Sequence, residues 1–190
     1  MLPDAVLFDM DGTLVDTEGL WWDATASIAR SLGVTVGQDD VLGRSVEDTA
    51  AMLTAADEVD GVAQRLTDAF ADHIRRGVSI IPGALGLLAE LSAEGIPTAL
   101  VSASPRSIVD LVLPNLNHRF DEVVAAEDTV RGKPYPDPYL EAARRLDVDP
   151  ERCVAIEDSP TGIAAARAAG CRVVAVTEAG LPDLRAMSLS

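Results

Sequence analysis

Two aspartates, two residues apart, follow directly after a short apolar segment near the start of the chain. Asp9 and Asp11 come after Ala5 to Phe8, and Gly12 follows them. If the chain stays extended here, both carboxylates project to the same side and can reach one site. Two such carboxylates can divide acid–base work, because one can stay ionised while the other carries a proton. An Asp-x-Asp pair also occurs where a strand simply ends, so the pair alone leaves both interpretations open.

Further polar side chains come directly after other apolar segments or in the loops beyond them. Open α/β sheets bind their ligands at the carboxyl ends of their parallel strands. We therefore expect these side chains to meet Asp9 and Asp11 at one edge of a sheet. They are Ser102, Lys133, Glu157 and Asp158.

The chemistry of this expected group indicates a metal ion and an anionic ligand. Carboxylates that lie close together repel one another unless a cation joins them. A hard, oxygen-seeking ion such as Mg²⁺ accepts carboxylates, backbone carbonyls and waters as ligands. Lys133, the Ser102 hydroxyl and the amides near Ser104 are suited to hold a phosphoryl group. Structural explanations remain open, since Ser102 can simply end a strand and Lys133 can be a solvated loop residue.

From residue 82 onward, apolar segments alternate with helical patterns. Pro82 and Gly83 open one helix, and Ser104 with Pro105 has the residue types of an N-cap and a first helical turn. Strands that alternate with helices at this spacing imply right-handed crossovers and a parallel sheet. The predicted strands are residues 5–8, 98–101, 122–126, 153–156 and 173–176.

Residues 17–78 carry helical patterns with no strand between them. Ser45 resembles the N-cap of a second helix, and apolar residues at helical spacing predict a third helix over residues 59–74. A helical run between the first strand and the rest of an α/β sheet predicts a separate cap. The first helix ends at Gly33 and has apolar residues at every fourth position, namely Leu20, Ala24, Ile28 and Leu32.

Length and composition exclude several classes of protein. A chain of 190 residues can bury one sizeable core with room for a small second lobe. The formal net charge of -16 disfavours nonspecific binding to nucleic acid or anionic membranes. The apolar runs are too short to span a bilayer, and the first residues do not resemble a signal peptide. We expect a cytoplasmic protein in which Cys153 and Cys171 are reduced core thiols.

The segment Asp9-Met10-Asp11-Gly12-Thr13, followed in order by Ser102, Lys133 and Glu157-Asp158, resembles the four motifs of the haloacid dehalogenase-like superfamily. The resemblance spans about the whole chain. It implies an α/β fold, a Rossmann-like three-layer parallel-sheet core with an inserted α-helical cap domain. The expected core comprises residues 1–16 and 79–190. The expected cap comprises residues 17–78 and decides the substrate, since the core contacts only the phosphate.

The resemblance also implies a reaction, the hydrolysis of a phosphomonoester. Asp9 is the expected nucleophile, which attacks phosphorus to form an aspartyl-phosphate that water then hydrolyses. Asp11 is expected to protonate the leaving oxygen and later to activate the water. The implied cofactor is Mg²⁺, and its implied ligands are Asp9, the Asp11 carbonyl, Asp158 and, as a ligand or a supporting residue, Glu157. The implied phosphate-binding residues are Ser102, Ala103 and Lys133, of which Lys133 also orients Asp9.

Within the superfamily, the chain resembles the phosphatase side. The dehalogenase branch has no metal and no carboxylic acid at the position of Asp11. A closer resemblance is to the β-phosphoglucomutase-like subgroup, whose mutases carry a histidine four residues after the threonine that matches Thr17. This chain has Trp21 there, which favours a phosphatase and leaves a phosphomutase as the alternative. Arg44 resembles a cap arginine that binds substrate in this subgroup, and Trp21 is a second candidate for the pocket wall.

The expected substrate is a small phosphorylated sugar, polyol or similar metabolite, because the cap is short and no nucleotide-binding signature is present. We expect a monomer with no nucleic-acid or membrane partner. A signalling receiver also combines aspartates, a hydroxyl and a lysine on a doubly wound sheet. Receivers lack a helical insertion after the first strand and an aspartate two residues beyond the phosphoacceptor. An inactive binding module is a further alternative, against which the intact carboxylates argue.

Overall fold

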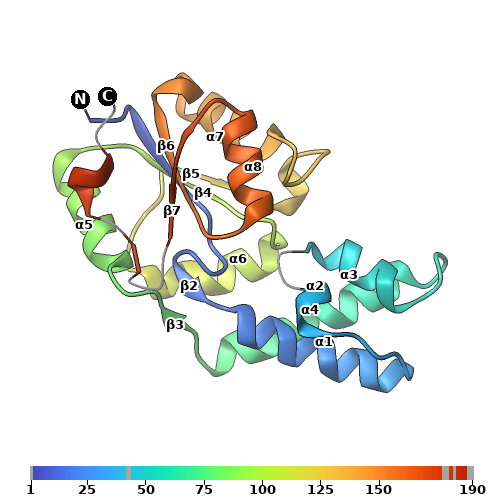
Figure 1. Cartoon of the computed structure of the whole chain (residues 1–190). Helices are drawn as coiled ribbons and strands as arrows, with labels where there is room; N and C mark the ends of the chain where they lie inside the picture. The colour runs from blue at the N-terminus through green and yellow to red at the C-terminus, as the bar shows by residue number, and fades with distance from the viewer. Residues whose placement is uncertain (1, 42–43, 177–179, 182, 188–190) are drawn as a thin grey trace.

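A parallel sheet lies at the centre of the computed structural model, which describes residues 2–41, 44–176, 180–181 and 183–187. In this part of the chain, five strands are hydrogen-bonded in the order β5-β4-β1-β6-β7 (Figure 1). All neighbouring pairs are parallel, which confirms the α/β fold class. The strands are β1 (Ala5–Phe8), β4 (Thr98–Val101), β5 (Glu122–Val124), β6 (Cys153–Glu157) and β7 (Arg172–Ala175).

Helices cover both faces of this sheet, and the side chains of β1 alternate between them. Val6 and Phe8 belong to one buried cluster with Leu88 of α5 and Ile108 of α6. Leu7 belongs to a second cluster with Tyr139 of α7 and residues of α8. Because both faces are covered, the strand is apolar without alternation. The helices are α5 (Ala84–Glu94), α6 (Arg106–Val112), α7 (Asp137–Leu146) and α8 (Pro160–Ala168).

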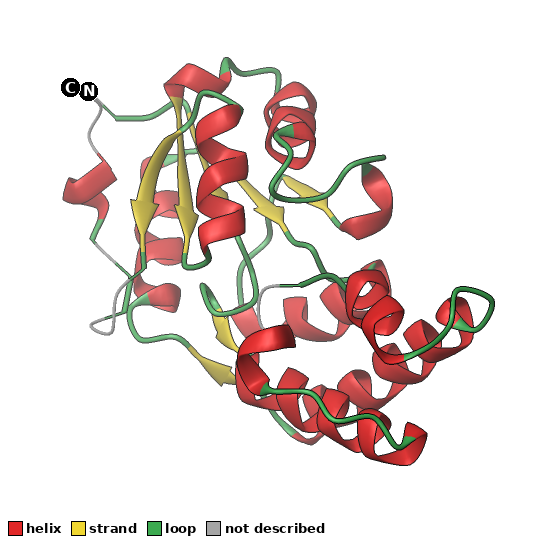
Figure 2. Cartoon of the chain, turned by 45° about the vertical axis from the view of Figure 1, so that its right-hand side comes forward, coloured by secondary structure: helices red, strands yellow, loops and turns green. Residues whose placement is uncertain are grey.

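Four further helices lie beyond the carboxyl ends of the strands (Figure 2). They follow β2 (Val15–Asp16) and precede β3 (Ser79–Ile80), two short strands that pair with each other in antiparallel fashion. The chain therefore leaves the sheet region and returns to it along adjacent segments. These helices are α1 (Glu18–Leu32), α2 (Gln38–Val41), α3 (Val46–Leu53) and α4 (Val59–Arg76).

Two details of the helices differ from the sequence-based expectations. The buried face of α1 contains Trp21 and Ala24, whereas Leu20 and Ile28 of the predicted stripe are only partly buried. The helix α6 has Pro105 as its N-cap rather than Ser104.

None of the helices in the described part of the chain combines the length and the hydrophobicity needed to cross a lipid bilayer.

Candidate active site

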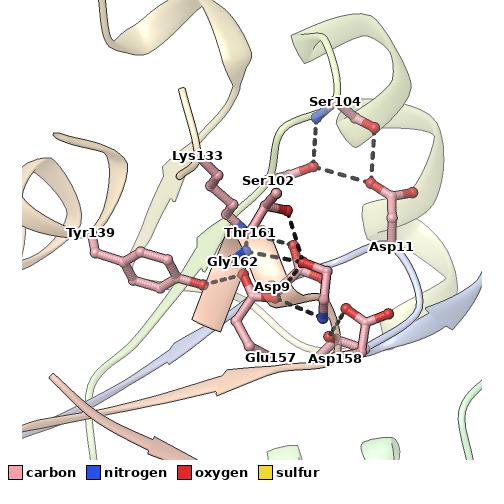
Figure 3. Close-up of polar contacts among 12 residues, drawn as sticks. Asp9, Asp11, Ser102, Ser104, Lys133, Tyr139, Glu157, Asp158, Thr161 and Gly162 are labelled. Carbon is pink, nitrogen blue, oxygen red and sulfur yellow. Dashed lines mark hydrogen bonds and ion pairs between the residues drawn. The ribbon is translucent and has the colours of Figure 1, made fainter. Parts of the chain in front are cut away.

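Three carboxylates meet at the carboxyl ends of β1 and β6. Asp9 directly follows β1, Glu157 is the last residue of β6, and Asp158 comes next. One oxygen from each carboxylate lies within 4.8 Å of the others. The side chains of Asp9 and Glu157 are buried. The sheet therefore brings together three of the predicted acidic residues, as Figure 3 shows.

Lys133 joins this group from the loop before α7. Its ammonium nitrogen lies 2.7 Å from Oδ1 of Asp9 and 2.5 Å from Oε1 of Glu157. Burial alone would lower the pKa of Lys133, but the two carboxylates hold that pKa above its ordinary value. For Asp9, burial and the charge of Glu157 raise the pKa, and the charge of Lys133 opposes them. Lys133 thus neutralises part of the buried negative charge.

The other carboxylate oxygen of Asp9 is left without a partner. Oδ2 of Asp9 is buried and accepts no hydrogen bond from any described residue. Burying an ionised oxygen in this way is costly unless a cation or a donor compensates it. Asp9 belongs to the three-carboxylate cluster, so the cost of this buried oxygen falls where further negative charge is gathered. The residues present therefore fit a bound cation that prefers oxygen ligands.

Two glycines leave the space that the acidic side chains occupy. A Cβ atom on Gly12 would lie 2.0 Å from Oδ2 of Asp158, and the φ angle of Gly12 is +83°. A Cβ atom on Gly162 of α8 would lie 1.9 Å from Oε1 of Glu157. Neither position has room for a larger residue unless a carboxylate moves.

Asp11 faces a different set of partners from the other acidic residues. Its carboxylate accepts hydrogen bonds from the hydroxyls of Thr17 (2.7 Å), Ser104 (2.8 Å) and Ser102 (3.3 Å). Burial raises the pKa of Asp11, and these three hydrogen bonds oppose the rise. The Asp11 carboxylate is not part of the three-carboxylate cluster. It lies on the side of the site where α1 and α6 begin, and it can hold a proton there.

Ser102 and Ser104 are linked at the end of β4. The hydroxyl oxygen of Ser102 accepts a hydrogen bond from the amide of Ser104 (3.0 Å) and donates to Asp11. The Ser104 hydroxyl is bound to Asp11, which explains why it does not cap α6. Ser102 and Ala103 both line the cleft described below.

Sequence reasoning missed two residues that hold the acidic side chains in place. The hydroxyl of Tyr139 donates to Oε1 of Glu157 at 2.6 Å and is buried. The hydroxyl of Thr13 donates to Oδ1 of Asp158 at 3.2 Å. Burial and the charge of Glu157 raise the pKa of Asp158 to about 6, against the hydrogen bond from Thr13. A buried tyrosine hydroxyl needs a partner, but the burial of Tyr139 is visible only in the structure.

A cleft of about 1060 Å³ lies between these residues and the helices α1 to α4. Trp21 and Arg44 both line it, as do Asp9, Asp11 and Lys133. The indole nitrogen of Trp21 donates to the carbonyl of Val41 (3.2 Å), and its ring packs edge-on against Phe70. Nε of Arg44 donates to the carbonyl of Asp40 (2.6 Å). The structure therefore brings all of the sequence-predicted site residues to one cluster or to the cleft beside it.

Comparisons with known proteins agree with this arrangement. The model of a family described as haloacid dehalogenase-like hydrolase matches residues 6–176. Hexitol phosphatase B of Escherichia coli is 33% identical over 183 residues, which cover 90% of this chain and 82% of that protein. The structure of CbbY from Rhodobacter sphaeroides in complex with phosphate has a TM-score of 0.83 at 29% identity, covering 92% of this chain and 86% of CbbY. β-Phosphoglucomutase from Clostridium difficile shares the fold, with a TM-score of 0.84 at 24% identity over 93% of this chain and 86% of the mutase. The chain belongs to the haloacid dehalogenase-like hydrolase family.

Proposed function

We propose that this protein is a Mg²⁺-dependent phosphatase that hydrolyses a small phosphomonoester through an aspartyl-phosphate at Asp9. One observation carries the proposal. Lys133 holds Asp9 through Oδ1, while the buried Oδ2 of Asp9 has no partner among the described residues. Asp9 also belongs to the three-carboxylate cluster and lines the cleft. A carboxylate fixed in one orientation is suited to attack phosphorus, because its positioning is complete before the substrate arrives.

The reaction requires two transfers at phosphorus. In the first, an oxygen of Asp9 bonds to phosphorus as the ester bond breaks, and Asp11 gives its proton to the departing alcohol oxygen. In the second, Asp11 takes a proton from water, whose oxygen bonds to phosphorus as the bond to Asp9 breaks. The raised pKa of Asp11 supports this role, because an acid must hold its proton until the alcohol leaves. Ser102, Ala103 and Lys133 hold the phosphate oxygens.

The proposed metal ligands are Asp9, the carbonyl of Asp11 and Asp158. A bound divalent cation would supply positive charge that offsets the repulsion between Asp9 and the phosphate. Glu157 is better suited to support than to direct coordination. Its Oε1 accepts from Lys133 and Tyr139, and its Oε2 accepts from Ser159 at 3.2 Å.

The proposed substrate is a phosphorylated sugar, polyol or similar metabolite. A relative named hexitol phosphatase B, 33% identical to this chain, supports this class. In our proposal, residues 17–78 form a cap that contacts the alcohol part, and residues 1–16 and 79–190 form the catalytic core. We also propose a cytoplasmic monomer, and the two buried free cysteines support a reducing compartment.

A phosphomutase is the second candidate, since a β-phosphoglucomutase shares the fold. Trp21 stands at the position where mutases of the β-phosphoglucomutase-like subgroup carry a histidine. This difference favours hydrolysis over the mutase reaction. A receiver is disfavoured, because four helices separate β2 from β3.

The experiment is a panel of phosphomonoesters, p-nitrophenyl phosphate included, assayed with Mg²⁺ and after chelation by EDTA. We expect turnover that disappears with EDTA and returns with Mg²⁺. Asp9→Asn should reduce kcat by at least about a thousandfold. Asp60→Asn, on the first turn of α4 and outside the cleft, is the matched control and should retain full activity. Undiminished turnover by Asp9→Asn, or after removal of the metal, would contradict the proposal.

A further inference from the structure

We infer that the cleft selects a phosphomonoester whose alcohol part carries no negative charge and presents several hydrogen-bond donors. This inference rests on the proposed phosphatase function and specifies the substrate class of the same site. It places hydroxyl-rich and amine-bearing esters above esters that carry a carboxylate or a second phosphate.

The charges that line the cleft are the first observation. Eight carboxyl groups and three cationic side chains line it. With Asp11 holding its proton, an excess of four negative charges remains among the described residues. A bound divalent cation and the dianionic phosphate of the substrate would cancel each other. The net negative charge of the cleft lining therefore acts on the alcohol part of the substrate.

The positions of these carboxylates are the second observation. Four of them come from the helices that face the catalytic residues across the cleft, in the first turns of α1, α2 and α3. None of the four has an ion-pair partner in the described part of the chain. A free helix N-terminus attracts anions, but a carboxylate in the first turn offsets that attraction. The four residues are Glu18, Asp39, Glu47 and Asp48.

The cationic side chains that line the cleft offer little compensation to a second anion. Lys133 is bound to Asp9 and Glu157. Both Nε and one terminal nitrogen of Arg131 bind the carboxylate of Asp137 at 2.9 Å. Arg44 is the one cation of the cleft without an ion pair among the described residues, and its Nε is already bound to a carbonyl.

The rest of the cleft lining fits an uncharged or positively charged group. The indole N–H of Trp21 donates to the carbonyl of Val41. Trp21 therefore has no free donor for a ligand, and it contributes the apolar surface of its ring to the cleft. Aromatic faces attract cations and pack against apolar surface. Ionised carboxylates only accept hydrogen bonds, so hydroxyl or ammonium donors match them and an anionic group does not.

A substrate with two phosphates is the natural alternative, because CbbY has been crystallised with xylulose-(1,5)bisphosphate. The test compares sorbitol, glucosamine and gluconic acid, each phosphorylated on its terminal primary hydroxyl, together with a hexose bisphosphate. We expect kcat/KM for the sorbitol and glucosamine esters to exceed that for the gluconate ester and the bisphosphate by about tenfold or more. This ratio should fall in high salt, because salt screens interactions between exposed charges.

Two variants test whether the carboxylates of α3 cause this preference for uncharged and cationic esters. The double variant Glu47→Gln, Asp48→Asn should reduce the ratio to about threefold or less, chiefly by lowering KM for the anionic esters. Asp60→Asn removes a carboxylate from the same group of helices but outside the cleft, and it should leave the ratio unchanged.

The outcomes separate the two proposals. Turnover with an equal or reversed charge preference, or a preference that the double variant keeps in full, would overturn this inference and leave the phosphatase function standing. Failure to hydrolyse any ester, p-nitrophenyl phosphate included, would overturn the phosphatase function and this inference with it.

Discussion

The ammonium nitrogen of Lys133 lies 2.7 Å from Oδ1 of Asp9, although the two residues are 124 positions apart in the chain. The orientation of the proposed nucleophile therefore depends on a loop that the sequence places far away. Both side chains are nearly inaccessible to solvent, at 5% and 8% exposure. A buried ion pair of this kind is strongly destabilised when one partner is removed, because the other charge stays buried alone.

Replacing Lys133 by methionine should therefore impair both activity and stability. We expect kcat to fall by about a hundredfold or more, and the free energy of unfolding without metal to fall by about 3–5 kcal/mol. Steady-state kinetics and urea unfolding measure the two effects. The double variant Lys133→Met, Glu157→Gln should regain part of the stability but none of the activity. A single variant within about tenfold of the wild-type kcat would contradict the role of Lys133.

Replacing Tyr139 by phenylalanine tests the support of Glu157. The ring, whose centre lies 5.2 Å from Nζ of Lys133, stays in place, and only the hydroxyl that donates to Glu157 is lost. A hydrogen bond to a charged group contributes about 1.5–3 kcal/mol, and we expect a loss in that range with a lower kcat. Tyr135→Phe, at a half-exposed tyrosine, should change the free energy of unfolding by less than about 0.5 kcal/mol. Equal effects of the two variants would show that the Tyr139 hydroxyl has no special role.

Two helical glycines should respond in opposite ways to replacement by alanine. In Gly162→Ala the new methyl group would collide with the carboxylate of Glu157, so we expect a loss of about 1–3 kcal/mol together with reduced activity. At Gly86 in α5 no atom lies within 4 Å of the added Cβ, so Gly86→Ala should stabilise the protein by about 0.5–1 kcal/mol. Thermal or urea unfolding measures both. Stabilisation by Gly162→Ala would mean that Glu157 does not occupy the observed position.

His118 should make stability depend on pH. Burial lowers its pKa from 6.5, and the charge of Asp121 opposes the shift. The folded state thus binds this proton less readily than the unfolded state, so the contribution is present above pH 6.5 and is lost as the pH falls below it. Urea unfolding on both sides of that pH compares the protein with His118→Asn, both carrying His73→Asn so that one imidazole titrates. The protein with His118 should lose more stability on acidification, and an equal loss would refute the prediction.

Sequence patterns predicted the parts of the fold that repeat a local rule. The strands were found from apolar runs, and the predicted residues 5–8 and 98–101 match the observed bounds of β1 and β4. The strands β2 and β3 have two residues each and α2 has four, which is too short for any periodicity to register. The face of α1 was misplaced because Trp21 packs against Phe70 of α4, a tertiary contact that a stripe of every fourth residue does not contain.

The candidate site was predictable where each side chain follows a strand, because parallel strands end at one edge. Contacts made across the site were not predictable. Ser104 and Pro105 have the residue types of a helix start, but the hydroxyl of Ser104 binds Asp11, 93 residues away in the chain. The partner of the Tyr139 hydroxyl is Glu157, 18 positions further along the chain at the end of β6, and no local pattern identifies it.

The burial of Lys133 has a practical consequence, because Lys133 is the only lysine in the chain. The surface offers an acylating reagent no ε-amino group, and arginine supplies every other basic side chain apart from the two histidines. Among the side chains, amine-directed labelling would therefore modify this one interior nitrogen alone. The rate of this modification would report how often the candidate active site opens to solvent.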